Sequence, residues 1–175
     1  MCSREPESTK SHKKELKKSI NFAILTISTS KFKEEGHDIS GNIISGCIEK
    51  EGHVVAKRDV ANDEINMIKE KICMHAKDKD IDIIVTTGGT GLAKRDVTIE
   101  AVKPLFEKEI SGFNPIFMHL SHNEIGPACM LSGATAGIIG AKAIFCLPGS
   151  PDACALAMEK IILKEAGHIL KHAGE

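Results

Sequence analysis

The sequence predicts an α/β fold, a three-layer α/β/α sandwich with a mostly parallel central sheet. Continuous apolar runs at 20–28, 81–87 and 141–147 have the pattern of strands buried on both faces. Amphipathic segments separate these runs, and the connections between them are short. With 175 residues, 42% hydrophobic and 27% charged, the chain has the length and composition of one globular domain.

The first half of the chain alternates strands and helices. After the strand at 20–28, a helical face within 41–52 carries Ile43, Ile44, Cys47 and Ile48, and Gly52 ends this helix. A short strand follows at 53–60. The next helix lies within 61–78, and its apolar face has helical spacing through Ile65, Ile68, Ile72, Cys73 and Ala76.

The second half continues the alternation after the strand at 81–87. A helix is expected over about 98–110, with inward-facing Val102, Leu105 and Phe106. The stretch 126–140 is rich in small residues and is predicted as a helix packed closely on the sheet. A strand at 141–147 and a terminal helix at 151–172 complete the domain.

The N-terminal residues 1–18 differ in composition from the rest. They contain Arg4 and five lysines, and Leu16 is the one large aliphatic residue after Met1. Such a segment buries too little apolar surface to offset the entropy of ordering it. We therefore expect a flexible basic arm at 1–18 and a single domain at 19–175.

Charge and aromatic content exclude several partners. The net charge of −1 provides no general attraction to nucleic acid or membranes, and the absence of Trp and Tyr argues against a base-stacking surface. No apolar run approaches the roughly 20 residues that span a bilayer, and the N-terminus lacks a secretory layout. The six cysteines form no C-x-x-C pair. Reduced thiols in a cytoplasmic protein are the expectation.

A glycine-rich stretch, Thr86 to Thr98, follows the strand at 81–87 and precedes a helix. Its glycines let the backbone turn sharply, and its exposed N–H groups can bind an anion. It is not a Walker A loop, because Ala93 stands where that motif requires glycine and Arg95 where it requires Ser or Thr, and it is not a dinucleotide fingerprint, because Lys94 stands where the last glycine is required. A tight turn without a ligand is the alternative.

Two carboxylates follow strand ends at the same edge of the predicted sheet. Asp96 belongs to the glycine-rich loop, and Asp63 belongs to an Asn-Asp-Glu sequence that opens the next helix. Each could cap its helix. Each could instead hold Mg²⁺ beside substrate phosphates, which Lys94 and Arg95 could also contact. A further loop, Leu147 to Pro151, forms a helix start with Ser150 as N-cap.

These motifs resemble, in the same order, those of the MoaB/MogA family of molybdenum cofactor biosynthesis proteins. The resemblance covers about residues 20–172. The motifs that carry it are ILTIS ending at Ser28, D-x-S-G at 38–41, NDE at 62–64, TTGGTG…RDVT at 86–98, MLS…AGI at 130–138 and LPGSP at 147–151. The Ser-Thr-Ser at 28–30 is more similar to the MoaB branch.

The resemblance implies the molybdopterin-binding fold in a homo-oligomer, a trimer or a hexamer. It implies Mg²⁺-dependent adenylylation of molybdopterin by ATP, with release of pyrophosphate and transfer of the product to a MoeA-type metal insertase. The motif match makes Asp63 and Asp96 the catalytic, metal-holding residues. The residues implied to bind substrate and phosphate are Ser28, Gly88, Gly89, Thr90, Gly91, Arg95, Thr98, Ser132, Pro148, Gly149 and Ser150.

Three positions depart from the usual family pattern. Gly133 replaces the arginine of an LSR motif, Ile99 replaces a proline, and Met118 stands where many members carry arginine. Fewer basic groups favour, as an alternative, a non-catalytic molybdopterin-binding or carrier subunit of the same pathway. A nucleotide hydrolase is a third candidate function, since the fold also occurs in CinA-type proteins.

Overall fold

The structure, a computed structural model, describes residues 19–30 and 37–175, so the predicted basic arm lies outside the described residues. Its described strands form one six-stranded sheet in the order β2-β1-β3-β6-β5-β4. Every strand is parallel except β5, which is antiparallel to both its neighbours. The strands are β1 Asn21–Ile27, β2 Val54–Ala61, β3 Ile83–Thr87, β4 Lys108–Glu109, β5 Thr135–Ile139 and β6 Lys142–Leu147.

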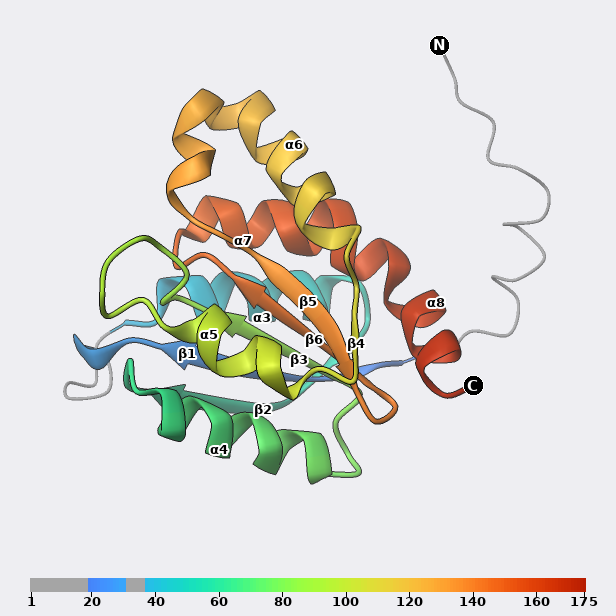
Figure 1. Cartoon of the computed structure of the whole chain (residues 1–175). Helices are drawn as coiled ribbons and strands as arrows, with labels where there is room; N and C mark the ends of the chain where they lie inside the picture. The colour runs from blue at the N-terminus through green and yellow to red at the C-terminus, as the bar shows by residue number, and fades with distance from the viewer. Residues whose placement is uncertain (1–18, 31–36) are drawn as a thin grey trace, which may run out of the picture.

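Helices cover both faces of this sheet, which confirms the predicted three-layer sandwich (Figure 1). One face carries α3 Ile39–Lys50, α6 Phe113–Ile125, α7 Pro151–Ala157 and α8 Leu163–Ala173. The other face carries α4 Ile65–Lys77 and α5 Thr98–Val102. A separate apolar cluster fills each side, because successive side chains of the buried strands point to opposite faces.

The parallel register brings the carboxyl ends of the central strands level. Thr26 of β1 pairs with Thr87 of β3, which pairs with Leu147 of β6. The chain moves outward from β1 in both directions, to β2 on one side and to β3 on the other. Strand order therefore reverses between β1 and β3, and ligands of open parallel sheets bind at such a reversal.

Most predicted elements are confirmed within a few residues. Gly52 adopts φ +77° immediately after Glu51, the C-cap residue of α3, as expected of a glycine that ends a helix. The terminal helix at 151–172 is continuous through one π-helical turn, Met158–Ile162, between α7 and α8. One inward-facing assignment is wrong: Ile65 is 40% exposed, because it occupies the first position of α4 and precedes the buried stripe.

The predicted helix at 98–110 is wrong beyond its first turn. After α5 the chain forms a 3₁₀ turn, Lys103–Leu105, and then the edge strand β4. Pro104 lacks the N–H that an α-helix needs at this point, so the helix cannot continue. Val102 is nevertheless buried and Phe106 packs against the same core, as the sequence predicted.

The predicted helix at 126–140 is also wrong. A 3₁₀ segment, Gly126–Leu131, leads into β5, which forms a hairpin with β6. Ile139 pairs with Lys142, so the hairpin turn consists of Gly140 and Ala141, and Gly140 has φ +58°. Small residues in β5 serve close packing on the sheet, since the ring of Phe106 covers Gly137.

Residues 113–125 form α6, a helix that was not among the elements predicted from the sequence. Its buried side chains, Phe113, Phe117 and Ser121, have a spacing of four residues, and this spacing is the signal for a helix. The five described cysteines are free thiols, as predicted, and burial raises the pKa of Cys146 to about 12. In the described part of the chain, no helix is long and apolar enough to cross a membrane.

Substitution of Gly137 by alanine is expected to destabilise the fold by about 1–3 kcal/mol, because it overpacks the core. A Cβ at this position would lie 2.3 Å from Cγ of Phe106. Gly46 in α3 is the matched control: a Cβ there meets nothing within 4 Å, so Gly46→Ala should stabilise the protein by about 0.5–1 kcal/mol. Urea unfolding measures both. Equal effects of the two substitutions would contradict the packing argument.

The buried His75 makes stability depend on pH. Burial lowers the pKa of His75 below its usual value, although Asp59, whose Oδ2 lies 3.1 Å from Nε2, opposes this effect. The unfolded chain therefore binds the proton more tightly, and the free energy of unfolding should fall as pH decreases from about 7.5 to 5.5. Urea titrations should show a smaller decrease for His75→Gln and an unchanged one for the exposed His122→Gln. A wild-type curve no steeper than that of His75→Gln contradicts this prediction.

Candidate active site

Four loops meet at the carboxyl edge of the sheet. They follow β1, β2, β3 and β6 and comprise residues 28–30, 62–64, 88–97 and 148–150. The first three enclose a cavity of about 430 Å³. Its lining combines a backbone turn, hydroxyls, two carboxylates and a guanidinium: Ile27, Ser28, Thr29, Ser30, Asp63, Gly89, Arg95 and Asp96. The structure thus brings both predicted catalytic carboxylates to one cavity at the reversal of strand order.

Asp63 is held by the neighbouring loop and not by its own helix. Its Oδ2 accepts hydrogen bonds from the backbone N–H of Thr29 at 2.8 Å and from Thr29 Oγ1 at 2.7 Å. Glu64 occupies the N-cap position of α4, and no side chain makes a capping hydrogen bond there. The capping interpretation of Asp63 is therefore wrong.

The glycine-rich loop needs glycine at its two leading positions. Gly88 has φ +101° and Gly89 has φ +65°, backbone conformations that residues with a side chain rarely adopt. A Cβ on Gly88 would lie 2.3 Å from the carbonyl oxygen of Ile27, and one on Gly89 would lie 2.4 Å from Thr98 Oγ1. Thr98 in turn donates from Oγ1 to the carbonyl of Gly88 and closes the loop at its helix end.

Asp96 folds back over this loop. Its Oδ2 accepts a hydrogen bond from the backbone N–H of Ala93 at 3.1 Å. A Cβ on Gly91 would lie 2.6 Å from the same oxygen, so the carboxylate occupies the space that the glycine leaves. The N-cap of α5 is Val97 and carries no side-chain capping bond. The capping interpretation is therefore wrong for Asp96 as well.

Two further groups of the loop suit a phosphate ligand. Thr90 is 6% exposed, and its Oγ1 is buried without a hydrogen-bond partner among the described residues. The Arg95 side chain lines the cavity, and the described residues offer it no ion-pair partner. A buried hydroxyl and an unpaired guanidinium are groups that phosphate oxygens satisfy.

The loop after β6 is attached to its surroundings by three side chains. Thr87 Oγ1 donates to the carbonyl of Pro148 at 2.9 Å, and Cys154 Sγ donates to the same oxygen at 3.2 Å. Ser40 Oγ donates to the carbonyl of Gly149 at 2.7 Å. Ser150 occupies the predicted N-cap position of α7, but its side chain makes no capping bond.

The predicted site residues divide between two cavities. A smaller one, of about 100 Å³, lies between α6 and α7, and among its lining residues are Ser132, Pro148 and Ser150. The other predicted residues support these walls from the loops without lining either cavity: Gly88, Thr90, Gly91, Thr98 and Gly149. Gly91 forms a β-bridge with Ser132, so the glycine-rich loop joins the two groups.

The departures at Gly133 and Ile99 are in contact. A Cβ on Gly133 would lie 2.8 Å from Cδ1 of Ile99, and the Gly133 N–H donates to the carbonyl of Thr90 at 2.8 Å. The third departure, Met118, lines neither cavity and packs against the core beneath α6.

Two polar residues that line the cavity, Thr29 and Ser30, were not among the predicted site residues. The sequence contained a signal for them. Both follow Ser28 in a loop at a predicted strand end, where ligand-binding side chains concentrate.

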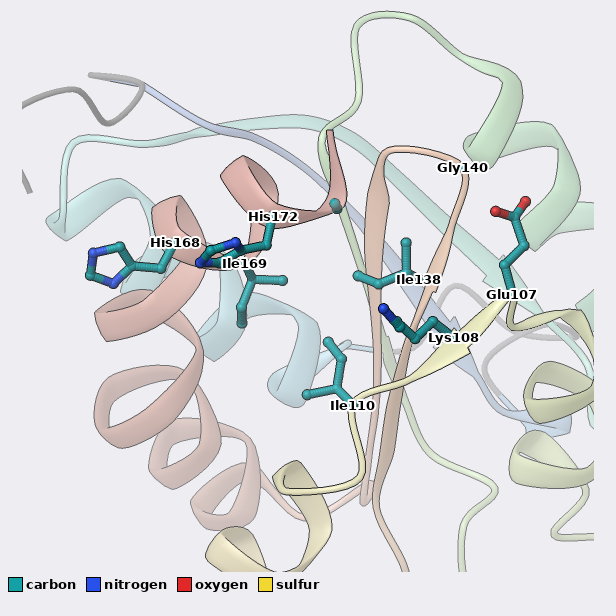
Figure 2. Close-up of a pocket in the computed structure, with 9 residues that line it drawn as sticks. Glu107, Lys108, Ile110, Ile138, Gly140, His168, Ile169 and His172 are labelled. Atoms are coloured by element: carbon teal, nitrogen blue, oxygen red, sulfur yellow. The ribbon is translucent and has the colours of Figure 1, made fainter. Parts of the chain in front are cut away.

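A larger cavity, of about 510 Å³, lies on another part of the molecule (Figure 2). Figure 2 shows His168 and His172 on α8 and Lys108 and Ile110 near the edge strand β4. Gly140, in the turn that precedes β6, places this cavity toward the opposite end of the sheet from the carboxylates. Its position does not match that of a ligand site at strand carboxyl ends.

Residues 23–168 match the sequence pattern of a protein family described as "Probable molybdopterin binding domain". The match spans nearly all the described residues and includes all four loops of the candidate site.

Individual proteins are similar over most of their length. The Molybdenum cofactor biosynthesis protein B of Bacillus cereus is 42% identical over 159 residues, 90% of this chain and 93% of that protein. The Molybdopterin adenylyltransferase of Pyrococcus furiosus is 42% identical over 168 residues, 94% of this chain and 97% of that protein. The crystal structure of the tungsten cofactor synthesizing protein MoaB from Pyrococcus furiosus superimposes with a TM-score of 0.82 at 39% identity, covering 91% and 99% of the two chains.

Ser40→Ala is expected to loosen the loop after β6, because the Gly149 carbonyl loses its donor from α3. The free energy of unfolding should fall by about 1 kcal/mol, and amide hydrogen exchange at Gly149 and Ser150 should become faster. Ser45→Ala is the matched control, since Ser45 lies in the same helix and contacts Glu49 at the surface. Equal exchange at 149–150 in both variants would show that Ser40 does not hold the loop.

Proposed function

Because this chain belongs to the family of probable molybdopterin-binding domains, we propose that it adenylylates molybdopterin with Mg²⁺ and ATP in molybdenum cofactor biosynthesis. The observation that carries the proposal is the cavity that holds Asp63 and Asp96 beside the glycine-rich loop. The name of the similar adenylyltransferase supports the same reaction. The step precedes metal insertion, so it serves a molybdenum or a tungsten cofactor equally.

The proposed reaction needs no protein nucleophile. An oxygen of the terminal phosphate of molybdopterin attacks the α-phosphorus of ATP, the bond from that phosphorus to the bridging oxygen breaks, and pyrophosphate leaves. Catalysis then consists mainly of positioning and of neutralising phosphate charge. Arg95 and Gly89 line the cavity, so the guanidinium and the backbone N–H groups of residues 89–91 would supply positive potential for the phosphates.

The two carboxylates fit Mg²⁺. The described residues contain no group of three or more His, Cys, Asp or Glu side chains placed to hold a metal ion. Mg²⁺ characteristically binds through one or two carboxylates and completes its octahedron with substrate phosphates and water. Asp63 and Asp96 would hold the ion, whose contribution is to neutralise charge on the phosphates.

We assign the smaller cavity to the pterin side of molybdopterin. Ser132 and Ser150 provide hydroxyls there, and Pro148 and Phe117 provide apolar surface. The β-bridge between Gly91 and Ser132 fixes this cavity relative to the phosphate loop. The division into a polar, charged cavity and a smaller mixed one suits a substrate with a phosphate at one end and a pterin at the other.

A non-catalytic carrier of molybdopterin is the second candidate function, and Gly133 favours it. The position contributes no basic side chain to neutralise phosphate charge, and Ile99 occupies the adjoining space. Tight binding of molybdopterin without release of pyrophosphate from ATP would select this function. Cleavage of a nucleotide in the absence of any pterin would instead indicate a hydrolase.

The proposed function includes the oligomeric state of the protein and the partner that receives its product. We expect a homo-oligomer, trimer or hexamer, and transfer of adenylylated molybdopterin to a MoeA-type insertase. Exposed apolar side chains of the glycine-rich loop, of α6 and of the 3₁₀ segment after it suit such contacts: Leu92, Ile116, Ile125, Met130 and Leu131. The free thiols of the described cysteines support a location in the cytoplasm.

Asp96→Asn is expected to reduce the rate of pyrophosphate release by about 100- to 1,000-fold, because it removes a charge that the catalytic cation requires. The assay combines purified protein, molybdopterin, ATP and Mg²⁺, and detects adenylylated pterin directly. Asp80→Asn is the matched control, since Asp80 is exposed at the opposite end of β3. Absence of product with the wild-type protein, or equal rates for Asp96→Asn, excludes the proposed function.

A further inference from the structure

The loops after β1 and β2 are aligned by the sheet itself. Ile27 pairs with Ala61 at the end of the parallel ladder, and the Ser28 N–H continues it by donating to the carbonyl of Ala61 at 2.9 Å. The chain therefore leaves both strands in register. Thr29 reaches Asp63 for this reason, although the two residues are 34 positions apart.

The two oxygens of the Asp63 carboxylate have different surroundings. Oδ2 accepts both hydrogen bonds from Thr29, and these occupy much of its lone-pair capacity. Oδ1 lies on the side of the glycine-rich loop, 3.4 Å from the point where a Cβ on Gly89 would stand. The oxygen nearer the proposed phosphates is therefore the one without these donors.

We propose that Thr29 is a positioning residue, which fixes the Asp63 carboxylate so that Oδ1 alone binds the catalytic cation. This inference rests on the proposed function. Mg²⁺ requires near-ideal octahedral geometry, so a carboxylate free to rotate would bind it less tightly than one held by two donors. Asp63 makes no capping bond to α4, so Thr29 supplies the side-chain contact that holds it.

The opposite carboxylate is arranged in the same way by a different donor. Asp96 also accepts a bond on Oδ2, from the backbone N–H of Ala93. A backbone donor survives any ordinary substitution. Thr29 Oγ1, by contrast, can be removed without changing the shape of the side chain. A substitution at Thr29 can therefore test whether this hydrogen bond positions the Asp63 carboxylate.

Thr29→Val removes the hydroxyl and retains the backbone donor, and Thr29→Ser retains both. In the adenylylation assay, the half-saturating Mg²⁺ concentration should rise about tenfold for Thr29→Val and stay within about twofold of wild type for Thr29→Ser. The dissociation constant for molybdopterin and the midpoint of urea unfolding should be unchanged in both. A Thr29→Val protein with the Mg²⁺ dependence of wild type overturns the inference.

Binding of Mn²⁺ in the presence of ATP, followed by electron paramagnetic resonance, provides a readout that does not require turnover. Thr29→Val should weaken Mn²⁺ binding about tenfold, and Ser45→Ala, a hydroxyl removed from the surface of α3, should leave it unchanged. If the wild-type protein makes no adenylylated pterin, the proposed function fails and Mn²⁺ binding still decides the role of Thr29. Equal binding by wild type and Thr29→Val, or no binding by wild type, overturns it.

Discussion

The candidate site depends on the contact between the ends of β3 and β6. Beyond the last paired residues, Thr87 and Leu147, the Gly88 N–H donates to the carbonyl of Leu147 at 3.1 Å. Thr87 Oγ1 then reaches the next carbonyl, that of Pro148. Gly149 closes the contact, because a Cβ there would stand 3.4 Å from Cα of Gly88. Two loops from distant parts of the sequence thus share one rigid base, and both cavities are built on it.

The carboxylates of Asp63 and Asp96 are not part of this contact between β3 and β6. Hydrogen-bond donors from neighbouring loop residues hold them instead. Each accepts on one oxygen from the chain beside it, Asp63 from Thr29 and Asp96 from Ala93. In both cases the donor belongs to a loop and the acceptor does not cap a helix. A carboxylate that is not used in helix capping, yet is ordered by hydrogen bonds at a cavity wall, is available to a ligand on its other oxygen. The arrangement supports a charge-neutralising role for the pair.

The sandwich could be predicted from the sequence because its central strands are apolar on both faces. Such a continuous apolar run can be recognised without knowing which segments pack together. The prediction failed at 126–140, where small residues are equally compatible with a close-packed helix and with a strand under an aromatic ring. The sequence feature that favours the strand over the helix is the two-residue turn Gly140–Ala141, which joins β5 to β6 as a hairpin. The presence of Asp63 and Asp96 at one cavity could be predicted, because each follows a strand end at the same edge of the sheet. Thr29 could not be assigned a role, because its partner is fixed by the register between β1 and β2 and not by spacing along the chain.

Two of the departures from the family pattern, Ile99 and Gly133, are also neighbours in space although they are distant in the sequence. Ile99 lies in the first turn of α5, and Gly133 lies just before β5. A Cβ on Gly133 would nevertheless stand only 2.8 Å from Cδ1 of Ile99. A side chain at 133 therefore requires the Cδ1 methyl group of Ile99 to move aside. With isoleucine present, glycine lets the backbone at 133 approach and donate to the carbonyl of Thr90. The positive charge lost at 133 is then not replaced locally, which leaves Arg95 as the guanidinium that lines the carboxylate cavity in the described structure.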